Sequence, residues 1–70
     1  MQTKTINAVS KTKREQAEVM AKAEGQNVVI FTVISNGIQM LATEQQYDES
    51  PNKDEVEVLE VISPEGKNIK

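Results

Sequence analysis

Histidine and cysteine, the side chains that most often carry chemistry in small proteins, are both absent from this 70-residue chain. Without them the commonest general base, the commonest metal ligand and the most reactive nucleophile are missing. Carboxylates, lysines, serines and Tyr47 remain, but the three glycines lie far apart and form no phosphate-binding loop or dinucleotide motif. A chain of this length also has little interior in which two carboxylates could be desolvated. We therefore predict no catalytic residue, no cofactor and no small-molecule substrate, and we predict that the protein is not an enzyme.

Oxygen-bearing side chains alternate in one segment of the second half of the chain: Asp48, Ser50, Asn52 and Asp54. These are positions 1, 3, 5 and 7 of the calcium loop of EF-hand proteins, which also needs a glycine at position 6 and a glutamate at position 12. The chain has Lys53 and Leu59 at those two positions. We therefore interpret the segment as an acidic, solvent-exposed turn and predict no metal site.

Charge is distributed unevenly along the chain, whose formal net charge is −3. The first 22 residues carry five basic and two acidic side chains, and the remaining residues carry three lysines and nine acidic side chains. Such a distribution is typical of proteins whose partners are selected by charge, although small domains also need charge for solubility. Both explanations stay open at this point.

Six acidic residues of the second half are predicted to cluster around one end and edge of a sheet: Glu44, Asp48, Glu49, Asp54, Glu55 and Glu57. This acidic edge could dock into a basic cleft of another protein, where charge would speed the encounter. Alternatively, the charges protect an exposed edge strand from pairing with other chains.

Three basic residues of the first half, Lys11, Lys13 and Arg14, could contact phosphates. No aromatic side chain for base stacking lies near them, and Glu15 and Glu18 interrupt the cluster. Binding through these residues would be weak, nonspecific and sensitive to salt. A solvent-exposed helix face explains the cluster better, so nucleic acid ranks third among the partners considered.

Residues 11–24 have the composition and the ends of a helix. Ser10 can cap the first turn, Gly25 suits a left-handed end, and neither proline nor glycine lies between them. Small or flexible apolar residues share one face at helical spacing: Ala17, Met20 and Ala21. This narrow stripe predicts a helix that packs closely on a flat neighbour.

β-Branched residues on either side of an Asn36-Gly37 pair predict a hairpin with strands at residues 27–35 and 38–46. Asparagine followed by glycine favours a two-residue type I′ turn, in which both residues have positive φ. Such a turn would set the pairing of the two strands and therefore the residues that share each face.

Two apolar faces result from this pairing. One carries Val29, Phe31, Val33, Ile38, Met40 and Ala42, and is predicted to pack on the helix. The other carries Val28, Ile30, Ile34 and Leu41 among polar residues. One amphipathic helix cannot cover both faces, so we expect the second face to be uncovered and to form an apolar protein-binding site.

Two further strands are expected, at residues 3–8 and 55–62, with an exposed loop at 47–54; residues 3–9 could instead extend the helix. In the last strand the alternation of valine and glutamate changes phase, which a β-bulge near Leu59 would repair. The predicted fold class is α+β, with one helix packed on a small, mainly antiparallel sheet of three or four strands. We expect a single domain over residues 1–70.

One segment resembles a known family. Residues 38–50, a short loop and residues 56–59 are similar to a strand–loop–strand hairpin of the phage inhibitors of uracil-DNA glycosylase, which are small, acidic, cysteine-free proteins that mimic DNA. Only Tyr47-Asp-Glu-Ser is identical, and the family's inhibitory Glu-Ser-Ile segment has no counterpart in this chain. The resemblance implies a hairpin over these residues and carries no site residue to this chain.

The absence of catalytic groups, the uneven charge and the apolar face favour a small protein-binding module. We expect it to inhibit or regulate a larger protein, by analogy with small proteins of phages and mobile elements. The alternative is a structural homo-oligomer, such as a homodimer, whose sheet faces or edges pair. The longest unbroken apolar run is only Val28–Phe31 and the N-terminus lacks an apolar signal segment, so we expect a cytoplasmic protein with no membrane partner.

Overall fold

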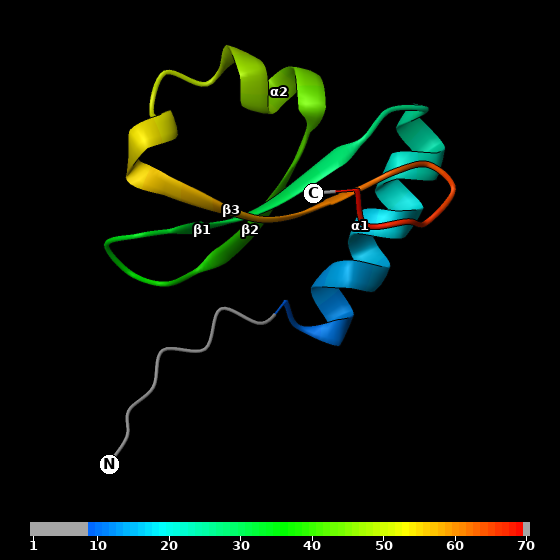
Figure 1. The fold of residues 1–70 in the computed structure, drawn as a ribbon, viewed down its shortest axis with the longest axis horizontal. Helices are drawn as coiled ribbons and strands as arrows, with labels where there is room; N and C mark the ends of the chain where they lie inside the picture. The colour runs from blue at the N-terminus through cyan, green and yellow to red at the C-terminus, as the bar shows by residue number, and fades with distance from the viewer. Residues whose placement is uncertain (1–8, 70) are drawn as a thin grey trace.

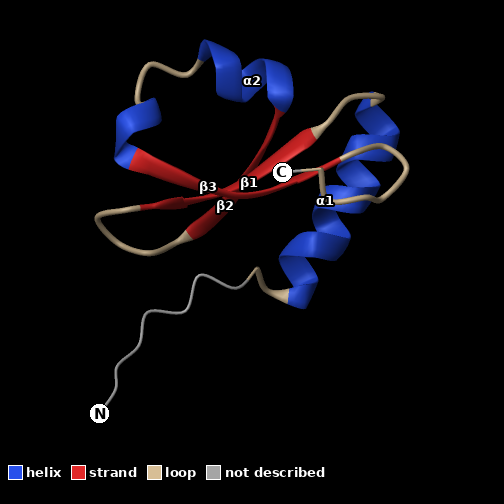
Figure 2. Cartoon of the chain, in the orientation of Figure 1, coloured by secondary structure: helices blue, strands red, loops and turns tan. Residues whose placement is uncertain are grey.

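Three strands, two helices and one turn of 3₁₀ helix make up the part of the chain that the computed structural model describes, residues 9–69. In chain order they are α1 (Lys11–Glu24), β1 (Val28–Val33), β2 (Gln39–Thr43), α2 (Glu44–Glu49), η1 (Lys53–Glu55) and β3 (Val56–Ile62) (Figure 2). The strands form one antiparallel sheet in the order β2-β1-β3, with β1 at its centre. The α+β class is confirmed, and the expected element at residues 3–8 lies outside the described residues.

Helix α1 begins and ends where the sequence predicts. The Ser10 hydroxyl oxygen accepts a hydrogen bond from the Lys13 backbone N–H (3.1 Å), and Gly25 has a left-handed φ of 67°. The N–H of Gly25 donates to the carbonyl of Ala21 at 2.8 Å. Ala17 and Ala21 have no exposed surface, so the alanine stripe lets the helix backbone approach the sheet closely.

The two faces of the sheet are covered differently (Figure 1). Helix α1 packs on one face, where the buried core consists of Ala17, Ala21, Val28, Ile30 and Ile62. Residues 44–55, which we call the strap, contain α2 and η1 and connect β2 to β3. The strap crosses the opposite face, because the Tyr47 ring of α2 lies 6.0 Å from the ring of Phe31, centroid to centroid. We therefore distinguish an α1 face and a strap face.

The prediction of which hairpin face meets α1 is wrong. Val28 and Ile30, which were expected on an uncovered face, are fully buried beneath α1, and Leu41 packs against the same core. The third strand explains the outcome, because Ile30 pairs with Glu60, and Arg14 of α1 forms an ion pair with Glu60. Both faces of the hairpin are apolar, so the hairpin sequence alone does not distinguish them.

The hairpin turn is longer than the type I′ turn that the sequence predicts. Val33 donates its N–H to the carbonyl of Ile38 at 3.0 Å, so four residues connect the two strands. Gly37 has a φ of 72°, whereas Asn36 has no positive φ and instead accepts a hydrogen bond from Ile38 N–H through Oδ1 (3.0 Å). The additional loop length lets Ile34 donate its N–H to the carbonyl of Glu55, which ties the turn to η1 (3.0 Å).

This turn moves the strand pairing by two residues. Phe31 pairs with Met40, where a two-residue turn would have placed Ala42. Side chains alternate between faces with a period of two, so the set of residues on each face does not change.

Residues 44–49 form helix α2, although the sequence analysis placed them in a strand and a loop. Thr43 and Gln46 form a capping box: the Gln46 N–H donates to Thr43 Oγ1 and the Thr43 N–H donates to Gln46 Oε1, both at 3.1 Å. These bonds satisfy two backbone donors and end β2 at Thr43. The missed signal was the Thr-x-x-Gln spacing.

Strand β3 contains the predicted β-bulge. Ile30 pairs with Glu60 and Phe31 pairs with Val58, so Leu59 is the extra residue. After β3 the chain folds back, and the Ile69 N–H donates to the carbonyl of Val61 at 2.8 Å.

Candidate protein-binding surface

The strap face of the sheet carries apolar side chains from all three strands and from the residue that precedes β2. They are Val29, Phe31 and Val33 on β1, Ile38, Met40 and Ala42 on and before β2, and Val56, Val58 and Val61 on β3. The α1 face mixes apolar residues with threonines, Gln39, Glu57 and Glu60. The more apolar face is therefore the one that lacks the long helix.

The strap covers only part of this face. Tyr47 packs against Phe31, and the Lys53 ammonium lies 5.8 Å from the centre of the Tyr47 ring. Lys53 Nζ also donates to the carbonyl of Asp48 at 2.6 Å, so its charge is held against the strap itself. No residue of α2 or η1 is buried. A strap of this kind shields the middle of the face without forming a second core.

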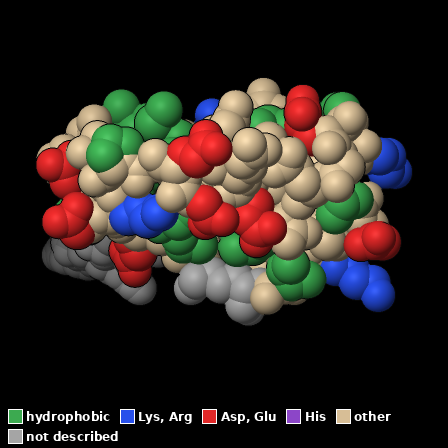
Figure 3. All heavy atoms as spheres, turned by 90° about the horizontal axis from the view of Figure 1, so that it is seen from above, with side chains coloured by type: hydrophobic (Ala, Val, Ile, Leu, Met, Phe, Trp, Pro, Cys, Tyr) green, Lys and Arg blue, Asp and Glu red, His purple; other side chains and the backbone are tan. Residues whose placement is uncertain are grey.

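Three large apolar side chains remain exposed near the β1–β2 turn. Ile34 is 62% exposed, Ile38 56% and Met40 46%, and we call these three residues the hairpin patch. Half-buried Val33 lies next to two of them: it precedes Ile34 in the chain, and its N–H donates a hydrogen bond to the carbonyl of Ile38. In the space-filling view, hydrophobic side chains gather at the end of the molecule where the turn lies, with carboxylates beside them (Figure 3).

The structure places the four residues of the predicted apolar site in two environments. Val28 and Ile30 belong to the core and Leu41 packs against it, so none of these three forms an open surface. Only Ile34 of that set is exposed. Ile38 and Met40 are predicted from the sequence to lie on the helix-covered face. The three valines of β3 could have identified the more apolar face, because a bulge at Leu59 puts all three of them on the strap face.

The six residues of the predicted acidic edge are all exposed, but only Glu57 lies on an edge strand of the sheet. Glu44, Asp48 and Glu49 lie in α2, Asp54 and Glu55 in η1, and Glu57 in β3. Five of the six therefore belong to the strap, which contains one cation, Lys53. Carboxylates are visible at several places on the side of the molecule that Figure 3 shows.

The basic residues at the start of α1 are not equivalent. Arg14 binds Glu60 in a bidentate manner, with Nη2–Oε2 at 2.5 Å and Nε–Oε1 at 3.1 Å. The hydrogen bonds and the negative charge of Glu60 raise the pKa of Arg14 above its ordinary value. Lys13 is half-buried and Lys11 is exposed. Arg14 therefore links α1 to β3. Of the three basic residues, only Lys11 and Lys13 are left for any phosphate contact.

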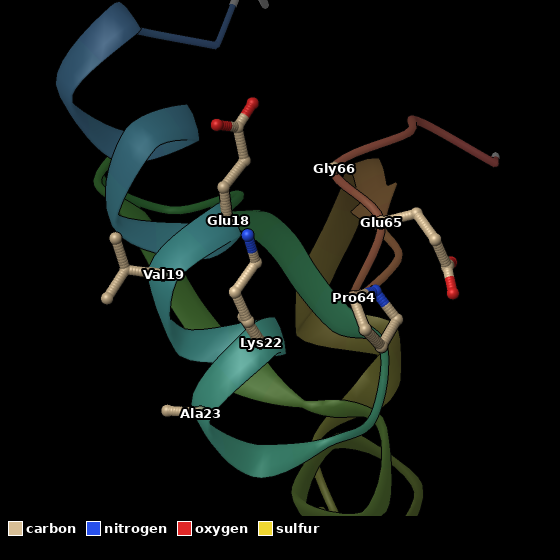
Figure 4. A pocket seen from close by; sticks show the side chains of 7 residues that line it. All are labelled: Glu18, Val19, Lys22, Ala23, Pro64, Glu65 and Gly66. Carbon is tan, nitrogen blue, oxygen red and sulfur yellow. The ribbon is translucent and has the colours of Figure 1, made fainter.

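A surface hollow of about 430 Å³ lies between α1 and the turn after β3. Its lining consists of Glu18, Val19, Lys22, Ala23, Pro64, Glu65 and Gly66, and the Val19 and Ala23 side chains point away from the turn (Figure 4). The titratable side chains of this lining are one lysine and two glutamates, and the lining contains no serine, threonine, cysteine or histidine that could act as a nucleophile beside a base. Among residues 9–69 no three potential metal ligands come together, and no helix is long and apolar enough to cross a bilayer.

No family model, curated protein or solved structure matches this chain. The local resemblance to the glycosylase inhibitors implied a strand that runs to the Tyr-Asp-Glu-Ser sequence. In the structure Tyr47–Glu49 belong to α2, so that hairpin is not formed. The surface itself is therefore the basis for a functional conclusion.

Proposed function

We propose that this chain is a non-enzymatic protein-binding module that inhibits or regulates a larger intracellular protein, and that it binds through Ile38 and Met40 on the strap face together with Ile34 of the adjoining turn. One observation supports this proposal above the others. Among residues 9–69 only the strap covers the more apolar face of the sheet, and two large side chains of that face, Ile38 and Met40, are about half exposed. Exposed apolar groups that lie together, next to charged residues, are typical of protein-binding surfaces.

The free energy of burial favours a partner on this surface. The described part of the chain buries six apolar residues, of which two are alanines, so its core is small. Complete burial of an isoleucine or methionine contributes about 1.5–3 kcal/mol, and the half-exposed side chains of the hairpin patch have about half of this contribution still available. A partner that covers the patch therefore gains affinity without any rearrangement of the sheet.

A second copy of the chain is the alternative partner. The small core favours it, because self-association is a common way for short chains to bury more apolar surface. In that case the structural homo-oligomer would be the primary role of the protein. The two proposals make different predictions for the mass of the purified chain.

The test uses light scattering behind a sizing column at several concentrations, together with photo-crosslinking in the source cells. A photoreactive amino acid replaces Met40, and the matched control carries it at Val19, which is 70% exposed on α1. We expect the unsubstituted chain to be monomeric and the Met40 position to yield one discrete adduct with another protein. The Val19 position should yield no such adduct.

Two results would contradict this function. A concentration-independent dimer whose adduct from position 40 is a second copy would support the homo-oligomer. A monomer that gives the same weak labelling from both positions would leave the patch without a protein partner.

A further inference from the structure

A shallow hollow lies between the β1–β2 turn and η1, beside the hairpin patch. Its volume is about 370 Å³, and it is lined by Ile34 and Ser35 of the turn and by Asp54 and Glu55 of η1. The backbone fixes its two sides relative to each other, because the Ile34 N–H donates to the Glu55 carbonyl. Glu55 in turn donates its N–H to the carbonyl of Asn52 at 3.0 Å, which closes the 3₁₀ turn. The hollow is therefore a fixed feature of the fold.

Among the described residues, no cation forms a salt bridge with the carboxylates of this hollow. Within residues 9–69 the single salt bridge joins Arg14 and Glu60, so neither Asp54 nor Glu55 takes part in one. Lys53 is adjacent in sequence, but its ammonium group is held by the Asp48 carbonyl and the Tyr47 ring.

An aliphatic wall beside two unpaired carboxylates fits one kind of protein side chain. Lysine and arginine carry an apolar stem and a cationic head, and they bury the stem along apolar surface while the head stays polar. Ile34, which is 62% exposed, would receive the stem, and Asp54 and Glu55 would receive the head. We propose, on the basis of the protein-binding function above, that the partner presents a lysine or arginine next to an aliphatic residue, and that the basic side chain occupies this hollow.

Other occupants fit less well. A second copy related by a two-fold axis that passes near this hollow would bring two sets of Asp54 and Glu55 together, and like charges that face each other oppose association. A purely apolar partner would desolvate the carboxylates without pairing them, which costs free energy. Charge complementarity therefore favours a basic partner over both.

The experiment titrates the isotope-labelled full chain with three short peptides of equal length and follows its backbone amide signals by NMR. The first peptide alternates lysine with leucine, the second glutamate with leucine, and the third lysine with serine. We expect the lysine–leucine peptide to shift the amides of residues 33–40 and 53–57 and to bind more tightly than the other two. Its affinity should fall as salt is added.

Charge variants separate the hollow from general attraction to an acidic protein. Asp54→Asn with Glu55→Gln should weaken the lysine–leucine peptide about five-fold, because each exposed ion pair contributes modestly. The control Glu15→Gln with Glu24→Gln removes the same charge from α1 and should leave the affinity within about two-fold. Asp54→Glu, which keeps the charge, should bind almost as the original chain does.

Each other result overturns the inference. Equal binding of the lysine–leucine and glutamate–leucine peptides at residues 33–40 would leave the protein-binding function intact and exclude a basic partner. Shifts spread over Glu15, Glu24 and Glu65 as well, or equal weakening by both pairs of variants, would show nonspecific charge attraction. Absence of any shift at residues 33–40 with all three peptides would count against both the basic partner and the proposed surface.

Discussion

Arg14 in the first turn of α1 and Glu60 in β3 form a bidentate ion pair across 46 positions of sequence. Glu60 is directly next to the bulged residue Leu59, which sets the side of the sheet that Glu60 faces. The ion pair therefore couples the position of α1 on the sheet to the position of the bulge in β3.

The Arg14–Glu60 pair should behave as a coupled unit in stability measurements. Arg14→Gln and Glu60→Gln should each lower the denaturant midpoint. The double variant should lose less stability than the sum of the two single variants, because each single variant already removes the same ion pair. Because the pKa of Arg14 is raised, the stability that charged Arg14 contributes is fully present below the pH at which arginine ordinarily loses its proton. It is lost only as the pH rises above that value. The Arg14→Gln loss should thus be constant between about pH 6 and pH 10.

The control for this cycle is Glu57→Gln, which removes an exposed carboxylate of the same strand. It should change the midpoint little and should be additive with Arg14→Gln. Strict additivity of the Arg14 and Glu60 variants would show instead that the two residues do not stabilise each other.

The close approach of α1 to the sheet should make its alanine stripe intolerant of larger residues. Ala21→Leu puts three more carbon atoms into a site with no exposed surface, and we expect a loss of about 1–3 kcal/mol in the free energy of unfolding. Ala23→Leu is the matched control, because Ala23 is exposed on the same helix and leucine is a good helix former there. Chemical denaturation of both variants measures the difference, and equal effects would contradict the packing described.

The hairpin turn should depend on the positive φ of Gly37. Gly37→Ala meets no atom within 4 Å, so its cost is conformational and should be about 1 kcal/mol. Gly37→Asn should cost less, because asparagine adopts the left-handed region more readily. Thermal unfolding of the two variants provides the comparison. If alanine and asparagine destabilise the chain equally, the left-handed conformation at residue 37 is not the reason.

The capping box should hold the strap in place. Thr43→Ala removes the acceptor for the Gln46 N–H and should cost about 1 kcal/mol, with increased exposure of the Phe31 ring beneath Tyr47. Thr43→Ser keeps the hydroxyl and should retain most of the stability. Hydrogen exchange of residues 44–49 measures the local effect. Unchanged exchange in Thr43→Ala would mean that the cap does not limit opening of α2.

Some of this fold follows from local sequence and some does not. The ends of α1 and the bulge at Leu59 are predictable, because caps and changes in alternation are local signals. The choice of face is not predictable from β1, since Val28 to Phe31 is apolar on both sides. That choice depends on Glu60 and Arg14, which are distant in sequence. The exposure of the six acidic residues was implied by their type, whereas their position on a helical strap depended on one unrecognised capping box.

The strap also separates the residues that determine the surface chemistry of its face from the residues that form the core. Neither α2 nor η1 contains a buried residue, so substitutions at their exposed positions alter surface chemistry and leave the core of α1 and the sheet untouched. Selection for a different partner can therefore act on the exposed residues of 44–55, apart from Gln46 of the capping box, without a large penalty in folding. In evolutionary terms, the strap is a segment that can diverge quickly on a scaffold that must stay the same.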